Sequence, residues 1–188
     1  TFFVTYGLIS DVRLQRRMQS TGKMTSENSN GNGTLRVLAE TAYPESTAAS
    51  RVRIAAFAPF LRDHGVDLQL YSTLTDSEYA LVSSSGFASQ KSLALATAAA
   101  RATLKRRPQH NLLLVQRLRF LSPLPGVDPP DRLDVYDFDD ALFLGAEGGL
   151  YQRWKWVKQE ARRCVAYLRR TRLAIAGNSF LADTARAY

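Results

Sequence analysis

The sequence feature that most constrains the fold is a strand–helix–strand succession at residues 35–71. Residues 35–39 predict a short strand, residues 48–64 a helix, and residues 66–71 alternate apolar and polar side chains as a second strand does. Gly65 provides the helix stop, and Pro59 should kink or shorten the helix. Because a helix of this length crosses over to a parallel neighbour, the segment predicts a right-handed βαβ unit.

The remainder of the chain continues the same alternation. Further elements are expected as helices at 75–86 and 89–107, buried strands at 112–116 and 173–176, a strand beginning near Leu133, and a final helix starting near Leu181. Strands that alternate with helices form a parallel sheet covered on both faces. The sequence therefore predicts an α/β protein with a Rossmann-like parallel sheet flanked by helices.

The composition changes sharply near Thr34. Residues 1–34 include a stretch rich in Ser, Thr, Asn and Gly, which cannot bury enough apolar surface to fold, so we expect a flexible leader there and a single domain at 35–188. No apolar run reaches the roughly 20 residues that a membrane-spanning helix needs. The single cysteine, Cys164, excludes an internal disulfide and a cysteine-based zinc site, which favours a cytoplasmic protein.

Positive charge is concentrated in one segment. Residues 150–172 hold eight basic residues and one acid, and so carry +7 of the net charge of +8 of the chain. Apolar residues recur there at steps of three and four, which predicts a long amphipathic helix over 148–172. Its basic face is either exposed to solvent or in contact with an anionic membrane surface. For a cytoplasmic protein, that surface would be the inner face of the membrane. The localised charge does not indicate a nucleic-acid partner.

Three carboxylates, Asp137, Asp139 and Asp140, lie where the strand after Leu133 runs out. In open α/β sheets, ligands bind outside the carboxyl ends of the strands. Three neighbouring carboxylates repel one another unless water, a cation or a basic side chain compensates them. The cluster is either a solvated turn or part of a site.

The loop that follows the first strand is the second candidate. Small and polar residues open the helix there, among them Glu45, Ser46 and Ser50, and a helix N-terminus can hold a phosphate or sugar hydroxyls. Arg51 and Arg53 follow in the first turns, where basic side chains oppose the helix dipole. Local helix stability does not explain these two arginines, so they are either solvated or ligands for an anion.

The common signatures of nucleotide-binding loops, zinc proteases and serine hydrolases are absent from the sequence. The segment Val135-Tyr-Asp-Phe-Asp-Asp-Ala-Leu142 resembles the haloacid dehalogenase phosphatase motif, with Asp137 as its first aspartate. Ala141 stands where that family has a threonine, and 48 residues follow Asp140, which is short for the remaining residues of that family.

Four segments, taken in order, give a broader resemblance. They are Pro44-Glu-Ser-Thr-Ala-Ala-Ser-Arg-Val-Arg-Ile54, Leu113-Leu-Val-Gln-Arg117, Val135-Tyr-Asp-Phe-Asp-Asp-Ala-Leu142 and Ile175-Ala-Gly-Asn-Ser-Phe-Leu-Ala-Asp183. Together they resemble the N-terminal half of a GT-B glycosyltransferase of the large retaining family 4 type. The resemblance covers about four-fifths of the chain.

The resemblance implies a two-domain enzyme whose N-terminal domain binds the acceptor and whose C-terminal domain holds the nucleotide-sugar. Ser50, Arg51 and Arg53 would then line the cleft, with Asn178 and Ser179 facing the same crevice. Asp137, Asp139 and Asp140 occupy a strand end where many relatives carry a histidine, which leaves their role as acceptor ligands, partners of the arginines or polarising groups open. The C-terminal donor domain lies outside this sequence, so the chain alone is expected to be inactive or nearly so.

The sequence thus predicts the acceptor-side domain of a glycosyltransferase that uses a nucleotide-sugar as co-substrate and a sugar or lipid-linked acceptor, with no cofactor and no metal. One alternative is a Mg²⁺-dependent phosphatase or phosphoryl-transfer domain that uses Asp137. The other is a non-catalytic binding module with a basic helix. A sharper expectation follows from the order of the elements: the carboxylates after Leu133 should face Arg51 and Arg53 across a cleft.

Overall fold

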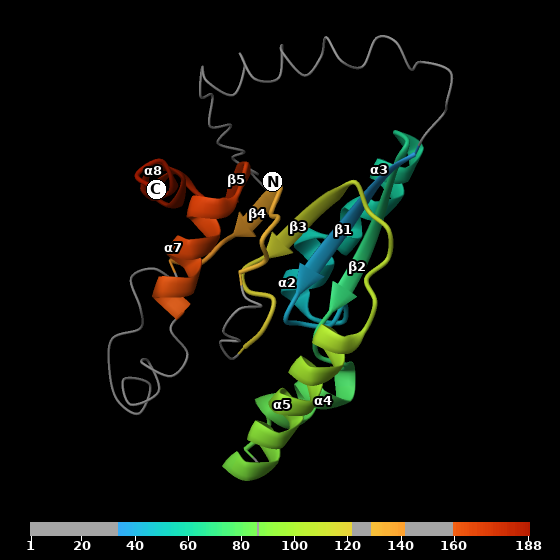
Figure 1. The fold of residues 1–188 in the computed structure, drawn as a ribbon, viewed down its shortest axis with the longest axis vertical. Coiled ribbons are helices and arrows are strands. Elements are labelled where there is room, and N and C mark those ends of the chain that lie inside the picture. The colour runs from blue at the N-terminus through green and yellow to red at the C-terminus, as the bar shows by residue number, and fades with distance from the viewer. Residues whose placement is uncertain (1–33, 86, 122–128, 142–159) are drawn as a thin grey trace.

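The computed structural model describes residues 34–85, 87–121, 129–141 and 160–188. These residues contain one all-parallel sheet with the strand order β2-β1-β3-β4-β5 (Figure 1). The strands are β1 (Leu35–Thr41), β2 (Val66–Ser72), β3 (Leu112–Gln116), β4 (Val135–Phe138) and β5 (Leu173–Ala176). The predicted α/β, Rossmann-like sheet is therefore confirmed, and the strands expected at 112–116 and 173–176 begin and end where predicted.

Helices and short helical turns connect the strands. They are α2 (Ala48–Arg53), the 3₁₀ turn η1 (Ala55–Phe57), α3 (Ala58–Asp63), α4 (Asp76–Ser83), α5 (Ala88–Leu104), α7 (Glu160–Arg170) and α8 (Ser179–Ala185). The predicted leader and the first part of the predicted basic helix, at 148–159, lie outside the described residues.

The helix expected over residues 48–64 is three shorter pieces. It breaks at Ile54, whose φ of −122° and ψ of −67° are not helical, and resumes at α3 with Pro59 in its first turn. A proline fits the first turn because its missing N–H has no helical partner there. Thr47 caps α2, and Gly65, with φ of +76°, ends α3 as predicted.

Two other expectations were wrong in detail. Residues 105–107 leave α5, because Lys105 is extended (ψ 126°) ahead of Pro108, so the predicted basic end of this helix is a loop. Strand β5 was expected to be buried, but it is the edge strand of the described sheet and only Ala176 in it is buried. Strand β3, at the centre of the sheet, is the most thoroughly covered of the predicted buried strands.

The strand order creates a switch point between β1 and β3. The chain passes from β1 to β2 on one side and then returns to place β3 on the other side of β1. Connections from such a pair leave on opposite faces of the sheet, which opens a crevice at the carboxyl ends of the two strands. The fold therefore places the segments after β1 and β3 where a ligand of an α/β protein binds.

Alternating side chains of β4 face two different helices. The ring of Tyr136 stacks on Tyr167 of α7 at 5.1 Å between centroids and on Phe138 at 5.3 Å, within the main hydrophobic core. Asp137, between them in sequence, points to the opposite face and is bound by Arg53 of α2. Because neighbouring side chains of a strand alternate, α2 and α7 cover opposite faces of the sheet.

Candidate functional site

A row of polar side chains crosses three strands beneath α2. Thr41, Gln116 and Asp137 are register partners at the ends of β1, β3 and β4, and each is at most 3% exposed. Gln116 donates its amide N–H to the Ala49 carbonyl of α2 at 3.0 Å. This row fixes the first helix onto the carboxyl end of the sheet.

Arg53 and Asp137 form a bidentate ion pair. The Arg53 Nε–H donates to Asp137 Oδ2 at 2.8 Å, and a terminal N–H of the same guanidinium donates to Oδ1. Burial raises the pKa of Asp137 above its ordinary value, while the bonds from Arg53 oppose that rise. The expected contact between the acidic strand end and the arginines of the first helix is confirmed for this pair.

Arg51 does not take part in that contact. It is exposed, and its guanidinium donates to the Ser46 carbonyl at 3.1 Å. The Ser46 hydroxyl in turn donates to Asp76, the first residue of α4. The expectation that both arginines face the carboxylates was therefore wrong for Arg51, which closes its own loop instead.

Arg117 compensates the other two carboxylates. It pairs with Asp140 through a short contact, and its Nε lies 4.0 Å from Asp139 Oδ1. Its guanidinium carbon also lies 5.8 Å from the ring centre of Tyr43, in a cation–π arrangement. The side chains of Arg117 and Asp139 are 24% and 31% exposed, and that of Asp140 is 52% exposed, so a ligand can reach this cluster.

The backbone of Arg117 is held in an unusual conformation. Its φ is +55°, in the left-handed region that favours glycine, and its N–H donates to the Asp137 carbonyl at 2.7 Å. The next loop residue, Leu118, accepts a bond of 2.9 Å from the Ala42 N–H. These bonds tie the segments after β1, β3 and β4 together and direct the Arg117 side chain to the aspartates.

The remaining predicted site residues lie around this cluster in different environments. Ser50 is fully buried and donates to the Tyr43 carbonyl at 3.2 Å, so it holds the loop after β1. Glu45 is exposed on that loop. Asn178 caps α8 by accepting from the Leu181 N–H at 2.9 Å, and Ser179 is the exposed first residue of that helix. A ligand-binding role for these residues stays a prediction.

A close backbone approach joins β5 to the acidic strand end. The Gly177 N–H donates to the Phe138 carbonyl at 2.9 Å, and a Cβ at Gly177 would lie 3.0 Å from the Cα of Asp139. The glycine thus lets the segment after β5 pass directly beside Asp139. The sequence segment around Asn178 is thereby brought to the same edge as the carboxylates, as expected.

Sequence reasoning missed Arg117 and Tyr43, and it also missed a buried charge cluster on the other face. Glu40 of β1 pairs with both Arg107 and Arg119, and Glu40 and Arg119 are each 3% exposed. The available signal was the placement of Arg117 and Arg119 directly after a buried strand, where charged side chains need partners.

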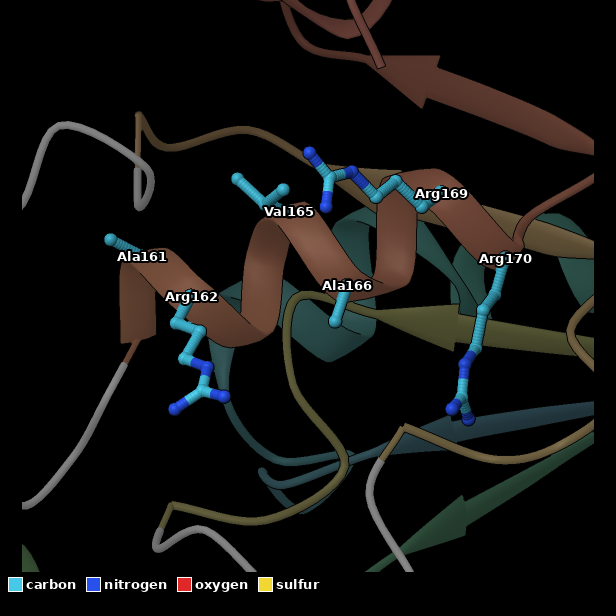
Figure 2. Close-up of a pocket in the computed structure, with 6 residues that line it drawn as sticks. All are labelled: Ala161, Arg162, Val165, Ala166, Arg169 and Arg170. Atoms are coloured by element: carbon cyan, nitrogen blue, oxygen red, sulfur yellow. The ribbon is translucent and has the colours of Figure 1, made fainter.

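In the described part of the basic helix, only some of the basic side chains are exposed to solvent. Arg163 was counted with the basic residues of that helix, but it is 4% exposed and donates to the Phe120 carbonyl at 2.7 Å. The exposed side borders a pocket of about 440 Å³ that is lined by alanine, valine and arginine side chains of α7 (Figure 2). Its lining residues are Ala161, Arg162, Val165, Ala166, Arg169 and Arg170.

Within the described part of the chain, no group of three or more His, Cys, Asp or Glu side chains is arranged to hold a metal ion. No helix among these residues is both long enough and apolar enough to cross a membrane. The fold and the site together define a class: an α/β protein with a Rossmann-like parallel sheet and a charged cluster beside its switch point. Comparisons of the chain with protein-family models, with curated proteins and with solved structures found no match.

Proposed function

We propose that this chain is the acceptor-side domain of a glycosyltransferase that uses a nucleotide-sugar donor. The observation that carries the proposal is the cluster of Arg117, Asp139 and Asp140 at the carboxyl ends of β3 and β4, beside the switch point of a parallel sheet. Sugars present several neighbouring hydroxyl donors, and a carboxylate accepts such bonds more strongly than a neutral group does. The cluster therefore suits an acceptor sugar.

The arginines hold these carboxylates in place without closing them off. Arg117 fixes Asp140, whose side chain is 52% exposed, and the Asp139 side chain is 31% exposed with its Oδ1 buried, so both aspartates still present exposed carboxylate surface to hydroxyls. Asp137 has a different role because both of its oxygens accept from Arg53 and its side chain is 5% exposed. Asp137 supports the site from below, and Asp139 and Asp140 contact the acceptor.

The ion pair between Arg53 and Asp137 disfavours the phosphatase alternative. A phosphatase of that type needs its first aspartate free to attack a phosphorus atom, whereas Arg53 binds both oxygens of Asp137. The carboxylates of the described residues also do not form a metal-binding group. The donor nucleotide-sugar and its leaving phosphate belong, in this proposal, to a second domain.

The exposed face of α7 suggests where in the cell such an enzyme would work. Arg162, Arg169 and Arg170 line a pocket on that face together with Val165 and Ala166 (Figure 2), and exposed arginines suit contact with anionic lipid headgroups. An enzyme with this surface would work on the cytoplasmic face of a membrane and take a sugar or lipid-linked acceptor. Reversing the charge of these arginines should weaken binding to anionic vesicles.

Binding of sugars to the isolated chain tests the proposed site. Amide signals from residues after β3 and β4 should shift in NMR spectra when a panel of mono- and disaccharides is titrated. Asp139→Asn with Asp140→Asn should weaken the binding about tenfold or more, because bonds to charged acceptors contribute about 1.5–3 kcal/mol. Asp183→Asn is the matched control, since Asp183 of α8 is an exposed aspartate paired with Arg186, which directly follows the helix.

Two outcomes would contradict the proposal. The first is that no sugar shifts these signals, and the second is that the double variant binds as tightly as the parent. A transferase assay on the product of the complete gene, measuring nucleoside diphosphate released from nucleotide-sugars, then tests the reaction itself. Turnover that survives the double variant unchanged would remove the two aspartates from the acceptor site.

A further inference from the structure

The helical hairpin of α4 and α5 projects away from the sheet (Figure 1). Helix α5 spans 17 residues, which corresponds to about 25 Å. Its buried residues, Ala98, Ala99 and Ala102, all lie in the part nearer the sheet. From Ala80 to Thr97 no described residue is buried. The end of the hairpin therefore stands free of the rest of the described fold.

This projecting end is nearly uncharged. Lys91 is the single charged residue between Tyr79 and Ala100, in a chain in which 22% of residues are charged. The other exposed polar residues are serines, a threonine and a glutamine. An element that contacts only water normally carries Lys, Glu, Arg or Asp. The composition therefore indicates a surface that meets something other than water.

Three large apolar side chains are exposed at this end. Phe87, in the connection between the helices, is 77% exposed, Leu93 on α5 is 69% exposed, and Leu81 on α4 is 36% exposed. We call these three residues the apolar tip. Single exposed apolar residues are common, but three on one projecting and uncharged element form a candidate interaction site.

Side-chain hydrogen bonds hold the base of the hairpin, so the direction in which it projects is fixed by the fold. Arg101 of α5 donates to both oxygens of Glu78 on α4, at 2.6 and 2.7 Å, and to the Thr73 carbonyl at 2.9 Å. Thr75 and Glu78 form a capping box at the start of α4. These bonds fix the direction of the two helices relative to β2.

We propose that the apolar tip inserts into the headgroup region of a lipid bilayer. Contact with another protein is disfavoured by composition, because such interfaces are enriched in aromatic residues, Met and Arg and depleted in Ser and Ala. Around the tip the pattern is the reverse: one Phe among many Ser and Ala residues. Charged residues are expensive to bury in a membrane, and Lys91 is the single charged residue between Tyr79 and Ala100.

Charge complementarity supports the same occupant. The net charge of +8 attracts the chain to an anionic leaflet, and Arg162, Arg169, Arg170 and Arg172 are exposed basic residues. Electrostatic attraction alone gives salt-sensitive binding, while insertion of Phe87 and Leu93 adds an apolar contribution that salt does not screen. The proposal concerns membrane contact and does not depend on the reaction that the site catalyses.

Vesicle sedimentation of the whole chain tests the proposal. Vesicles of phosphatidylcholine with phosphatidylglycerol should bind the parent chain, and Phe87→Ser with Leu93→Ser should weaken that binding about tenfold or more, since two exposed large apolar side chains are removed. The matched control is Phe60→Ser with Leu104→Ser, which removes one Phe and one Leu that are 60% and 85% exposed outside the tip. The control should bind like the parent.

A site-specific probe reports insertion directly. In Phe87→Cys, an environment-sensitive dye should react at position 87, because the single native thiol, Cys164, is buried. Its emission should shift to the blue on vesicle addition and should be quenched by spin-labelled lipids, whereas the same dye in Phe60→Cys should change little.

Three results would overturn the proposal. They are a parent chain that binds no vesicles, a tip variant that binds as well as the parent, and an unquenched dye at position 87. A tip variant that instead abolishes self-association in sedimentation velocity would assign the tip to contact between copies of the chain. Charge reversal at Arg162 and Arg169 separates the two contributions, because it should weaken binding at low salt only.

Discussion

The guanidinium of Arg53 holds both carboxylate oxygens of Asp137, 84 residues further along the chain. This contact joins the end of the first helix to the end of β4. The two partners differ in exposure, because the side chain of Asp137 is 5% exposed and that of Arg53 is 24% exposed. The two partners are therefore unequal, and their loss should have unequal consequences.

Arg53→Met should destabilise the fold more than Asp137→Leu does. The first variant leaves a buried carboxylate without its counter-charge, at a cost of about 3–5 kcal/mol. The second leaves an arginine that can still reach water, at a cost of about 1–3 kcal/mol. The double variant should lose less than the sum of the two, because an apolar pair replaces the buried charges. Urea unfolding of all four chains measures the cycle.

The pH dependence of this cycle gives its internal check. Burial already raises the pKa of Asp137, and removal of Arg53 should raise that pKa further. A carboxyl group whose pKa is raised by folding favours the folded state when protonated, and this contribution is lost as pH rises through the folded pKa. The Arg53→Met penalty should therefore shrink as the pH falls from 7. A penalty that stays constant or grows would argue against a buried carboxylate as its source.

The sequence predicted the sheet well because its signals are local. Apolar runs such as 112–116 and turn residues such as Gly65 determine where strands and helices begin and end, and parallel pairing follows from the helical crossovers. The Arg53–Asp137 contact could also be anticipated, because two arginines oppose the dipole of their own helix and need a partner elsewhere. The end of α5 at Leu104 was predicted three residues too late, and the pairing of Arg107 with Glu40 in a distant strand could not be read from local signals.

The site was predicted less completely for a related reason. The positive φ of Arg117 follows from the bond that its N–H makes to Asp137 in a neighbouring strand, and no glycine marks the position. The pairing of Arg51 with its own loop, rather than with the aspartates, depends on rotamer choices that spacing does not determine. The sequence pattern therefore does not determine the long-range contacts that individual side chains make.

Gly177→Ala should destabilise the fold by about 1–3 kcal/mol, which is the usual cost of an added methyl group in a tightly packed place. The new Cβ would lie 3.0 Å from the Cα of Asp139 and 3.2 Å from its Cβ, and backbone atoms there cannot rotate away. The segment after β4 must shift, so NMR signals of Asp139 should move as well. A variant with parental stability and unshifted Asp139 signals would show that the two segments are looser than this contact indicates.

Glu40→Gln should be more damaging than Arg107→Ala. Glu40 pairs with Arg119, which is 3% exposed, so the glutamine removes a negative charge that contacts a buried guanidinium, at about 3–5 kcal/mol. The Arg107 side chain is 35% exposed, and Glu40 keeps its pair with Arg119 when Arg107 is removed, so this loss should cost about 1 kcal/mol or less. Thermal or urea unfolding checks the order, and equal losses would contradict the assignment of Arg119 as the dominant partner.

Acid should loosen the base of the α4–α5 hairpin before it unfolds the sheet. Hydrogen bonds from Arg101 are the largest cause that lowers the pKa of Glu78, from 4.5 to about 2. Because the folded pKa lies below the unfolded one, this stabilisation is complete above about pH 4.5 and is lost as the pH falls toward 2. Amide hydrogen exchange in α4 and α5 should accelerate in that window, and Glu78→Gln should remove the pH dependence there.

Arg117→Gly should separate stability from ligand binding. Glycine adopts a φ of +55° freely, whereas other residues pay about 1–2 kcal/mol there, so the variant removes a backbone cost. The lost ion pairs with Asp139 and Asp140 are partly exposed and contribute about 0–1 kcal/mol. Urea unfolding should therefore show unchanged or slightly higher stability, while sugar binding falls because the two aspartates lose the arginine that orients them.

Arg117→Ala provides the matched comparison for that variant. Alanine loses the same ion pairs but keeps the unfavourable backbone conformation, so it should be less stable than the glycine variant by about 1 kcal/mol. Both variants should bind sugars equally poorly, since both lack the guanidinium. If glycine and alanine were equally destabilising, the left-handed backbone of Arg117 would carry no cost. If either variant bound sugars as the parent does, the guanidinium would have no part in presenting the aspartates to a ligand.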